Sequence, residues 1–290
     1  MEPSFVILTE SSCDLTPELA QRSGVEILPL TFTMEEKTYA HYPDGREMPI
    51  AEFYRKIRSG ATATTAAANV AELSNTMEQH LRRGKDVLFL CFSSGLSSTR
   101  DACVIAAEEL RERYPERRIE TVDTLSAAAG QGLLVLLAGQ ERLQGKTLEQ
   151  VRDYVEETRL HIAHWFMVED LAYLKRGGRI SPTAAAIGTM LHIKPLLRVD
   201  DEGKLAAMEK ARGKKAAVQT LLRHMEETAL RPVGTVLITH ADSPDGAAEL
   251  EQEVRERFSP REILTVPMGP VIGAHTGPGL LALVFLAQRR

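Results

Sequence analysis

The chain has 290 residues, of which 43% are hydrophobic and 26% charged, a composition typical of a globular protein with about two domains. Its formal net charge is −5. The chain lacks the basic excess that neutralises a phosphate backbone, which excludes nucleic acid as its main partner.

The first half alternates short apolar runs with segments of helical periodicity. Four runs are typical of strands, at 5–9, 25–34, 87–92 and 119–124. Helices are predicted over 69–84, 99–115 and 126–145. This alternation predicts an α/β fold with a parallel, Rossmann-like sheet, whose ligands bind beyond the carboxyl ends of its strands.

The pattern changes after a further helix predicted over 148–161. Residues 192–213 are typical of a β-hairpin with its turn at 200–203, followed by a helix over 214–230. Beyond this point strands and helices no longer alternate regularly. We therefore predict a boundary near Ile162, with an α/β domain over 1–161 and an α+β domain over 162–290.

A cluster of hydroxyl groups follows the third predicted strand, in the sequence FSSGLSSTRDA of residues 92–102. A helix starting near Arg100 places these hydroxyls and free backbone N–H groups at its N-terminus. Such a terminus favours an anion even where no Lys or Arg is present. The simpler interpretation is that Ser98 or Thr99 only caps the helix.

Other kinds of site fit the sequence less well. Residues 95–99 lack the second glycine of the G-x-S-x-G elbow, so a serine nucleophile has little support. The glycine-rich segments lack the phosphate-loop pattern. His161 and His164 lie three residues apart on a predicted helix end but have no third ligand. We expect neither a metal nor a cofactor.

The cysteines and the N-terminal stretch bear on the cellular compartment. Cys13, Cys91 and Cys103 are odd in number and lack C-x-x-C spacing, so we interpret them as packing residues in a reducing compartment. The chain starts with neither a basic segment nor a long apolar one, and no run approaches the roughly 20 apolar residues that cross a bilayer. We expect a cytoplasmic protein.

Several stretches together resemble the DegV family of bacterial fatty-acid-binding proteins, which includes the FakB-type subunits of fatty acid kinase. They run nearly end to end in the family's order. The combination of GGRI at 177–180 with HTGPG at 275–279 is the most specific part. The other matching stretches are ILTESSCDLTPELA, VEILPLTF, SSGLSST, VDTLSAAAGQGLLV, VEDLAYLKRGGRIS, IGTMLHIKPLLRVDDEGKL, KARGKKAA and GPVIGAHTGPGLLALVF.

The resemblance implies a long-chain fatty acid bound between the two domains. Its carboxylate is expected to be held by Thr65, Ser97 and His275. Ser94, Gly95 and Thr276 are expected to support that site.

Two family motifs are altered in this chain. Only Thr65 survives from a family Thr-Ser-Gln-Pro-Ser motif, which reads TAAAN here. Glu10 stands where the family usually has Asp. The hydrogen bonds around Thr65 are therefore harder to predict than those of Ser97 or His275.

The resemblance also implies a division of labour. The chain is expected to be a carrier that makes no bonds itself, while an ATP-dependent fatty acid kinase subunit forms the acyl phosphate. Arg179 and Arg212 lie beside glycines in turn-like contexts, so we expect them to be exposed and to contact that kinase. Transient contact with a membrane surface stays open. The alternatives are an acyl hydrolase with Ser97 as nucleophile and His275 as base, and a lipid sensor without a kinase.

Elementary energetics are consistent with a lipid ligand. Each buried methylene contributes about 0.8 kcal/mol, so roughly fourteen of them supply on the order of 11 kcal/mol before ordering costs. The carboxylate then needs only hydrogen bonds from hydroxyls, N–H groups and an imidazole, and no Lys or Arg. The segments 182–197 and 280–287 are candidates for the wall of the apolar tunnel, or for ordinary core.

Overall fold

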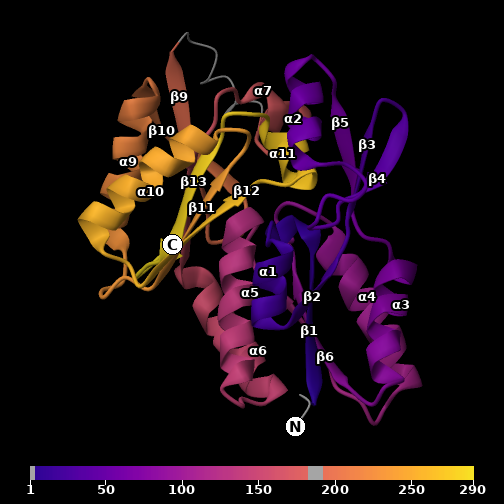
Figure 1. Cartoon of the computed structure of the whole chain (residues 1–290). Helices are drawn as coiled ribbons and strands as arrows, with labels where there is room; N and C mark the ends of the chain where they lie inside the picture. Colours follow the sequence, from indigo (N-terminus) through magenta and orange to yellow (C-terminus); the bar gives the residue numbers. More distant parts are fainter. Residues whose placement is uncertain (1–3, 182–191) are drawn as a thin grey trace.

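The computed structural model describes residues 4–181 and 192–290 (Figure 1). Its N-terminal sheet has four parallel strands in the order β2-β1-β6-β7. This arrangement confirms the predicted α/β class. The strands are β1 (Phe5–Glu10), β2 (Val25–Leu28), β6 (Asp86–Cys91) and β7 (Ile119–Asp123).

Helices cover both faces of this sheet, which explains why its central strands β1 and β6 are almost continuously apolar. Along β1, Val6 and Leu8 pack on one helical layer, while Phe5 and Ile7 pack on the other. The first layer is α3 (Val70–Leu81) and α4 (Thr99–Arg113). The second is α1 (Pro17–Ser23), α5 (Ala128–Leu143) and α6 (Leu148–Thr158), with short 3-10 turns η1 (Ser11–Cys13) and η2 (Arg159–His161).

A small antiparallel sheet, in the order β4-β3-β5, was not predicted. The run 25–34, predicted as one strand, divides between β2 and β3 because Pro29 has no N–H and the Leu30 N–H donates to the Ser11 hydroxyl at 3.0 Å. The sheet elements are β3 (Thr31–Met34), β4 (Lys37–Ala40) and β5 (Ala63–Ala66), next to α2 (Ile50–Arg58).

A six-stranded mixed sheet, in the order β10-β9-β8-β13-β11-β12, forms the rest of the molecule. The predicted hairpin is confirmed, because β9 and β10 pair antiparallel. The strands are β8 (Ile162–Met167), β9 (Ile193–Val199), β10 (Leu205–Arg212), β11 (Thr235–His240), β12 (Glu262–Pro267) and β13 (Leu281–Leu286). The helices are α7 (Ala172–Arg176), α9 (Lys214–Thr228), α10 (Pro244–Phe258) and α11 (Pro270–Thr276).

This sheet begins at Ile162, where we placed the domain boundary, although the division into 1–161 and 162–290 stays a prediction. His161 ends the short turn η2. The expectation that His164 belongs to a helix end is wrong, because it lies buried inside β8. The run IAHWFM around it is apolar enough to form a buried strand.

Helix α5 lies between the two larger sheets (Figure 1). All its residues from Ala129 to Gly139 are buried, and its apolar cluster includes residues of both sheets. A helix that is apolar on every side fits only such a position. Within the described ranges, none of the helices combines the length and the hydropathy needed to cross a membrane.

Two further predictions can be placed. Cys13, Cys91 and Cys103 are all buried and free, as expected of packing residues. The tunnel-wall candidate 182–197 lies outside the described residues up to 191, so that part of it stays a prediction.

Candidate functional site

A pocket opens where the three sheets and the N-terminus of α5 meet. The cavity itself measures about 100 Å³, and about 860 Å³ of space lies between its lining atoms when open solvent at the mouth is included. The second tunnel-wall candidate contributes directly, because Leu280, Ala282 and Val284 line the pocket from alternate positions of β13 and its start.

The polar residues predicted for the site line this one pocket. Thr65 comes from β5, Ser97 from the loop after β6, and His275 from the end of α11. The hydroxyl of Thr65 is hydrogen-bonded to Nε2 of His275 at 2.7 Å. Residues separated by 210 positions are thus joined at the site that the sequence indicated.

The pocket is polar at its mouth and largely apolar inside. Thr65, Ser97 and His275 are each partly exposed, whereas Ala282 and Val284 on the inner wall are only 7% and 2% exposed. A ligand with one charged end and a long apolar part matches this gradient, because the charge stays near water while the apolar part is desolvated.

His275 is held as a neutral imidazole with one nitrogen free. Burial and the nearby Arg179 guanidinium lower its pKa to about 4. Its Nδ1 is buried and has no hydrogen-bond partner among the described residues. The ring lies against Gly177, where a β-carbon would overlap Nδ1, so the glycine of the GGRI motif leaves space for the histidine.

Ser97 bonds to the loop and helix beside it. Its hydroxyl is hydrogen-bonded to the Thr99 hydroxyl at 3.0 Å and accepts from the Thr99 N–H at 3.2 Å. Ser98, at the N-cap of α4, makes no side-chain capping bond. The interpretation that Ser98 caps the helix is therefore wrong, and the hydroxyl bonded to the first turn is that of Ser97, which also lines the pocket.

The altered TAAAN motif still connects with this loop. The Thr99 hydroxyl accepts a hydrogen bond from the Ala68 N–H at 3.2 Å. This contact uses the backbone of Ala68, so it does not need a polar side chain at position 68. Ala66 and Ala67 line the pocket. The loss of polar residues here gives the mouth a less polar wall while Thr65 keeps its bond to His275.

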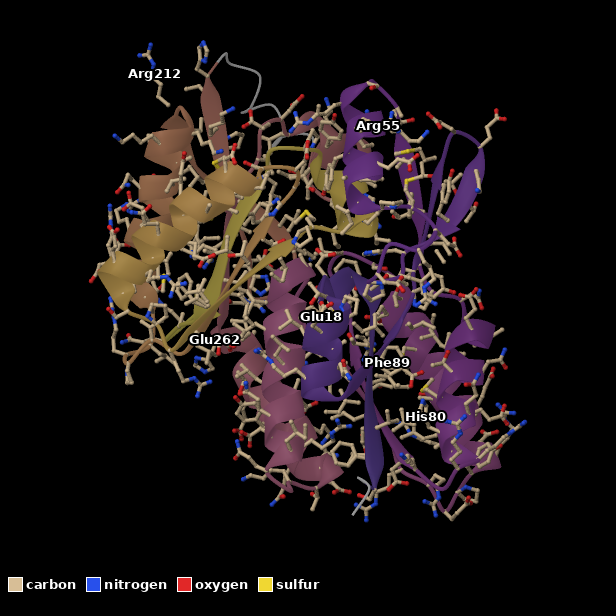
Figure 2. All side chains as sticks on the ribbon, in the orientation of Figure 1. Glu18, Arg55, His80, Phe89, Arg212 and Glu262 are labelled. Atoms are coloured by element: carbon tan, nitrogen blue, oxygen red, sulfur yellow. The ribbon has the colours of Figure 1, made fainter. Side chains whose placement is uncertain are left out.

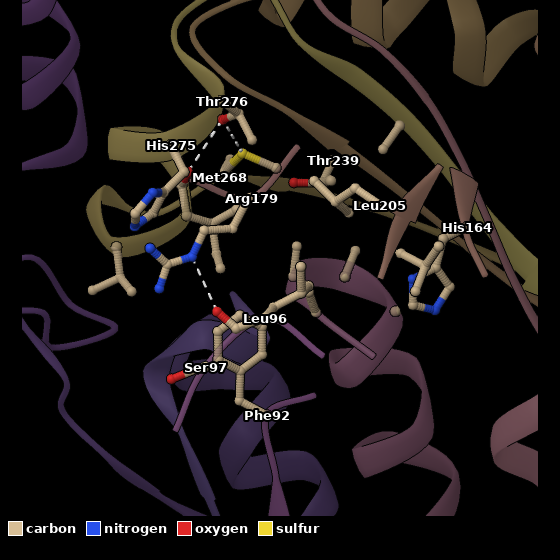
Figure 3. Close-up of a pocket in the computed structure, with 18 of the residues that line it drawn as sticks. Phe92, Leu96, Ser97, His164, Arg179, Leu205, Thr239, Met268, His275 and Thr276 are labelled. Carbon is tan, nitrogen blue, oxygen red and sulfur yellow. Dashed lines mark hydrogen bonds between the residues drawn. The ribbon is translucent and has the colours of Figure 1, made fainter. Parts of the chain in front are cut away.

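The expectation that Arg179 is exposed is wrong. Arg179 is partly buried and lines the pocket beside His275 (Figure 3). Its Nε donates to the Leu96 carbonyl at 3.0 Å and its Nη1 to the Gly177 carbonyl at 2.6 Å. These bonds hold the chain after α7 against residues 92–98, the loop between β6 and α4 that contains the hydroxyl cluster and is called the hydroxyl loop below. The site therefore contains a guanidinium, although we expected only neutral donors.

The three supporting residues differ in what they do. Thr276 lines the pocket, and its hydroxyl donates to Met268 Sδ at 3.2 Å (Figure 3). Ser94 and Gly95 are not among the pocket-lining residues. The Ser94 N–H donates to Asp123, and a β-carbon on Gly95 would lie 2.7 Å from the Glu202 carbonyl oxygen. Gly95 therefore lets the hairpin turn approach the loop.

Arg212 is exposed, as expected, at the end of β10, where it points away from the molecule (Figure 2). It is not among the residues that line the pocket. A role for Arg212 or Arg179 in contacting a kinase stays a prediction.

Glu10 is hydrogen-bonded to the first residue of the hydroxyl loop. It is fully buried at the end of β1, where its carboxyl group accepts from the Phe92 N–H at 3.1 Å and from Gln131 Nε2 at 2.8 Å. Burial raises its pKa from 4.5 to about 7, against the lowering effect of these hydrogen bonds. The longer side chain, in place of the family's Asp, thus reaches the residue where the loop begins.

We expect Glu10 to make the folded state less stable as the pH rises. Between pH about 4.5 and 7 the unfolded chain releases the proton and the folded chain keeps it, which removes about 3 kcal/mol of stability over that interval. Denaturant unfolding of the natural protein and of Glu10→Gln measures this loss. From pH 5 to 8, the free energy of unfolding of the natural protein should fall relative to that of Glu10→Gln by up to about 3 kcal/mol. A difference between the two proteins that does not change with pH would contradict the assignment.

The geometry gives no support to two other chemistries. The described hydrogen bonds of Ser97 go to Thr99, and His275 Nε2 is bonded to Thr65, so no serine–histidine pair is formed. Among residues 4–181 and 192–290, no group of three or more His, Cys, Asp or Glu side chains is arranged to hold a metal.

Comparison with known proteins then places the chain. A model of the DegV family, described as "Uncharacterised protein, DegV family", matches residues 4–288. The chain belongs to the DegV family. A DegV domain-containing protein of Clostridium perfringens is 39% identical over 287 residues, which cover 99% of this chain and 98% of the relative.

Two solved DegV-type structures have the same fold. A fatty-acid-binding DegV family protein of Thermus thermophilus has a TM-score of 0.88 and 31% identity, with 98% of this chain and 99% of that chain covered. The B3 protein of the Streptococcus pneumoniae fatty acid kinase, loaded with linoleic acid, has a TM-score of 0.85, with 98% of this chain and 99% of that chain covered. Its identity is 18%, so this likeness concerns the fold alone.

Sequence reasoning missed two polar groups of the DegV pocket. A basic residue beside two glycines is typical of an exposed turn, so the sequence predicts Arg179 at the surface. The sequence favours a solvated or core histidine over a metal ligand at His164 and does not indicate that it lines the pocket from β8. An apolar run containing a single histidine, as in IAHWFM, was the available signal for a buried polar group.

Proposed function

We propose that this protein binds one long-chain fatty acid without forming a covalent bond to it. The carboxylate lies at the mouth, where Ser97, Arg179 and His275 converge, and the alkyl chain fills the apolar space beneath. The observation that carries this proposal is the gradient of the pocket, polar and partly exposed at one end and largely apolar and buried at the other. The fatty-acid-binding relative of Thermus thermophilus supports it.

The head group is recognised by hydrogen bonds of complementary kinds. Within residues 4–181 and 192–290, the hydrogen bonds of the Arg179 guanidinium use Nε and Nη1, which leaves Nη2 to donate to a carboxylate oxygen. His275 lines the mouth with its Nε2 bonded to the Thr65 hydroxyl, so this pair offers a further hydrogen bond to the same group. Ser97 adds a hydroxyl, and the N-terminus of α4 adds a partial positive charge.

We further propose that the bound acid is presented to a separate ATP-dependent kinase, which transfers phosphate to the carboxylate. The head-group residues are partly exposed, so a partner can reach the carboxylate while the alkyl chain stays buried. In this role the chain acts as a carrier and supplies no nucleophile, consistent with the absence of a bond between Ser97 and His275 among the described contacts.

The kinase step is tested with Arg212→Ala. Because Arg212 is exposed and does not line the pocket, we expect unchanged fatty-acid affinity and several-fold slower phosphorylation by a cognate kinase. Arg55→Ala is the matched control, since Arg55 is an exposed arginine on α2, on another part of the surface (Figure 2). Equal phosphorylation of the two variants and the natural protein removes Arg212 from the docking surface.

A further inference from the structure

A second polar group lies deep in the pocket, apart from the head-group residues. His164 is 4% exposed and lines the pocket from the middle of β8. Within the described ranges, its Nε2 has no hydrogen-bond partner. Native structures rarely leave a buried polar atom without a partner, so this atom requires an explanation.

The strand register places His164 away from the mouth. Its neighbour across the sheet is Val284 of β13, and the next residue of β8 on the same face is Phe166, paired with Ala282. Val284 and Phe166 both line the pocket wall. Figure 3 shows the imidazole on the opposite side of the pocket from His275 and Arg179. It therefore faces the alkyl part of a ligand whose carboxylate lies at the mouth.

The surroundings of His164 keep it neutral and unpaired. Burial and the charge of Arg290 lower its pKa well below the usual value, so the ring carries one N–H donor and one acceptor. The ring lies against Gly130 in the first turn of α5, where a β-carbon would overlap it. Because position 130 is a glycine, the His164 imidazole occupies the space that a side chain there would fill.

Thr239, a second pocket residue with an unpaired buried polar atom, is too far from His164 to be its hydrogen-bond partner. Thr239 Oγ1 is buried and also has no partner among the described residues. Thr239 pairs with Ala282, and Ala282 with Phe166, so Thr239 lies two strands across and two residues along from His164. With strands about 4.8 Å apart and a rise of about 3.3 Å per residue, that separation is roughly 12 Å.

We propose that the pocket selects acyl chains that carry a hydroxyl or keto oxygen in the half remote from the carboxylate, with His164 Nε2 as its hydrogen-bond partner. This inference rests on the proposed fatty-acid function and deepens it by naming the class of acid. A saturated chain leaves Nε2 without a partner, whereas an oxygen at the matching carbon satisfies both buried groups at once. Val284, which faces His164 across the sheet, is apolar, and Gly130 of α5 has no side chain, so neither offers Nε2 a partner.

The test compares stearic acid with a series of hydroxystearic acids, hydroxylated at successive carbons of the remote half, by calorimetric titration of delipidated protein. For the best-placed isomer, the affinity relative to stearic acid should fall about tenfold in His164→Leu, which corresponds to about 1.4 kcal/mol. His161→Leu is the matched control, because His161 is an exposed histidine three residues away and outside the pocket. It should leave the relative affinity within about twofold.

Three outcomes separate the possible failures. Equal relative affinities in the natural protein and His164→Leu would overturn the inference and assign Nε2 to an ordered water. If His164→Leu does not unfold cooperatively, the natural protein decides, since a relative affinity independent of hydroxyl position overturns the inference equally. Failure of the natural protein to bind stearic acid or any of the hydroxy acids contradicts the proposed function itself.

Discussion

Replacing Ala282 with phenylalanine is expected to abolish fatty-acid binding, with a loss of at least about a hundredfold. Ala282 lies at the centre of the inner wall, paired with Phe166 of β8 and Thr239 of β11, and is 7% exposed. A phenyl ring at this position occupies the path of the alkyl chain. Displacing about four methylenes costs roughly 3 kcal/mol, which corresponds to that loss.

The measurement is the thermal stabilisation that a fatty acid gives to delipidated protein. A ligand at a hundred times its Kd stabilises the folded state by about 2.7 kcal/mol, so the natural protein should melt several degrees higher with the acid present. Ala282→Phe should unfold cooperatively and show no such increase. Ala282→Ser is the matched control, because it keeps the space open. An undiminished increase in Ala282→Phe would place the ligand elsewhere.

Replacing Arg179 with methionine should weaken binding of the acid by ten- to a hundredfold. A hydrogen bond to a charged group contributes about 1.5–3 kcal/mol, and Arg179 is the cation that lines the mouth within the described residues. Methionine keeps much of the side-chain volume and removes the charge. Partial exposure of Arg179 places the expected effect toward the lower end of the range.

The control for Arg179→Met is a ligand without charge. Arg179 also holds the Leu96 and Gly177 carbonyls, so its loss can disturb the loop as well as the head group. A fatty alcohol of the same chain length keeps the alkyl contacts and lacks the carboxylate. We expect its affinity to change less than threefold in titrations of the variant. Equal losses for acid and alcohol would show that Arg179 acts through the loop alone.

The parts of the fold that could be predicted depend on local pattern. The strands of the parallel sheet are apolar runs separated by amphipathic helices, and the hairpin at 200–203 has turn residues between two strands. The sheet β4-β3-β5 was missed because its strands are four residues long. Runs this short show too little alternation to distinguish a strand from a loop.

The candidate site was predicted in part, and the reason differs from residue to residue. Thr65, Ser97 and His275 came from the family resemblance, and the structure brings all three to one pocket. Arg179 was misplaced because its partner, the Leu96 carbonyl, lies 83 residues away in the chain. Sequence spacing carries no information on contacts of this kind, which depend on how the strands and helices pack.

The most direct test of the central claim is mass spectrometry of the protein purified from bacteria, first under native conditions and then after denaturation. We predict a native mass that exceeds the chain by one fatty acid, an intact free acid released on denaturation, and a denatured chain of unmodified mass. A chain that carries no lipid and takes up none when a fatty acid is supplied, or that keeps an acyl group on Ser97 after denaturation, would contradict the account.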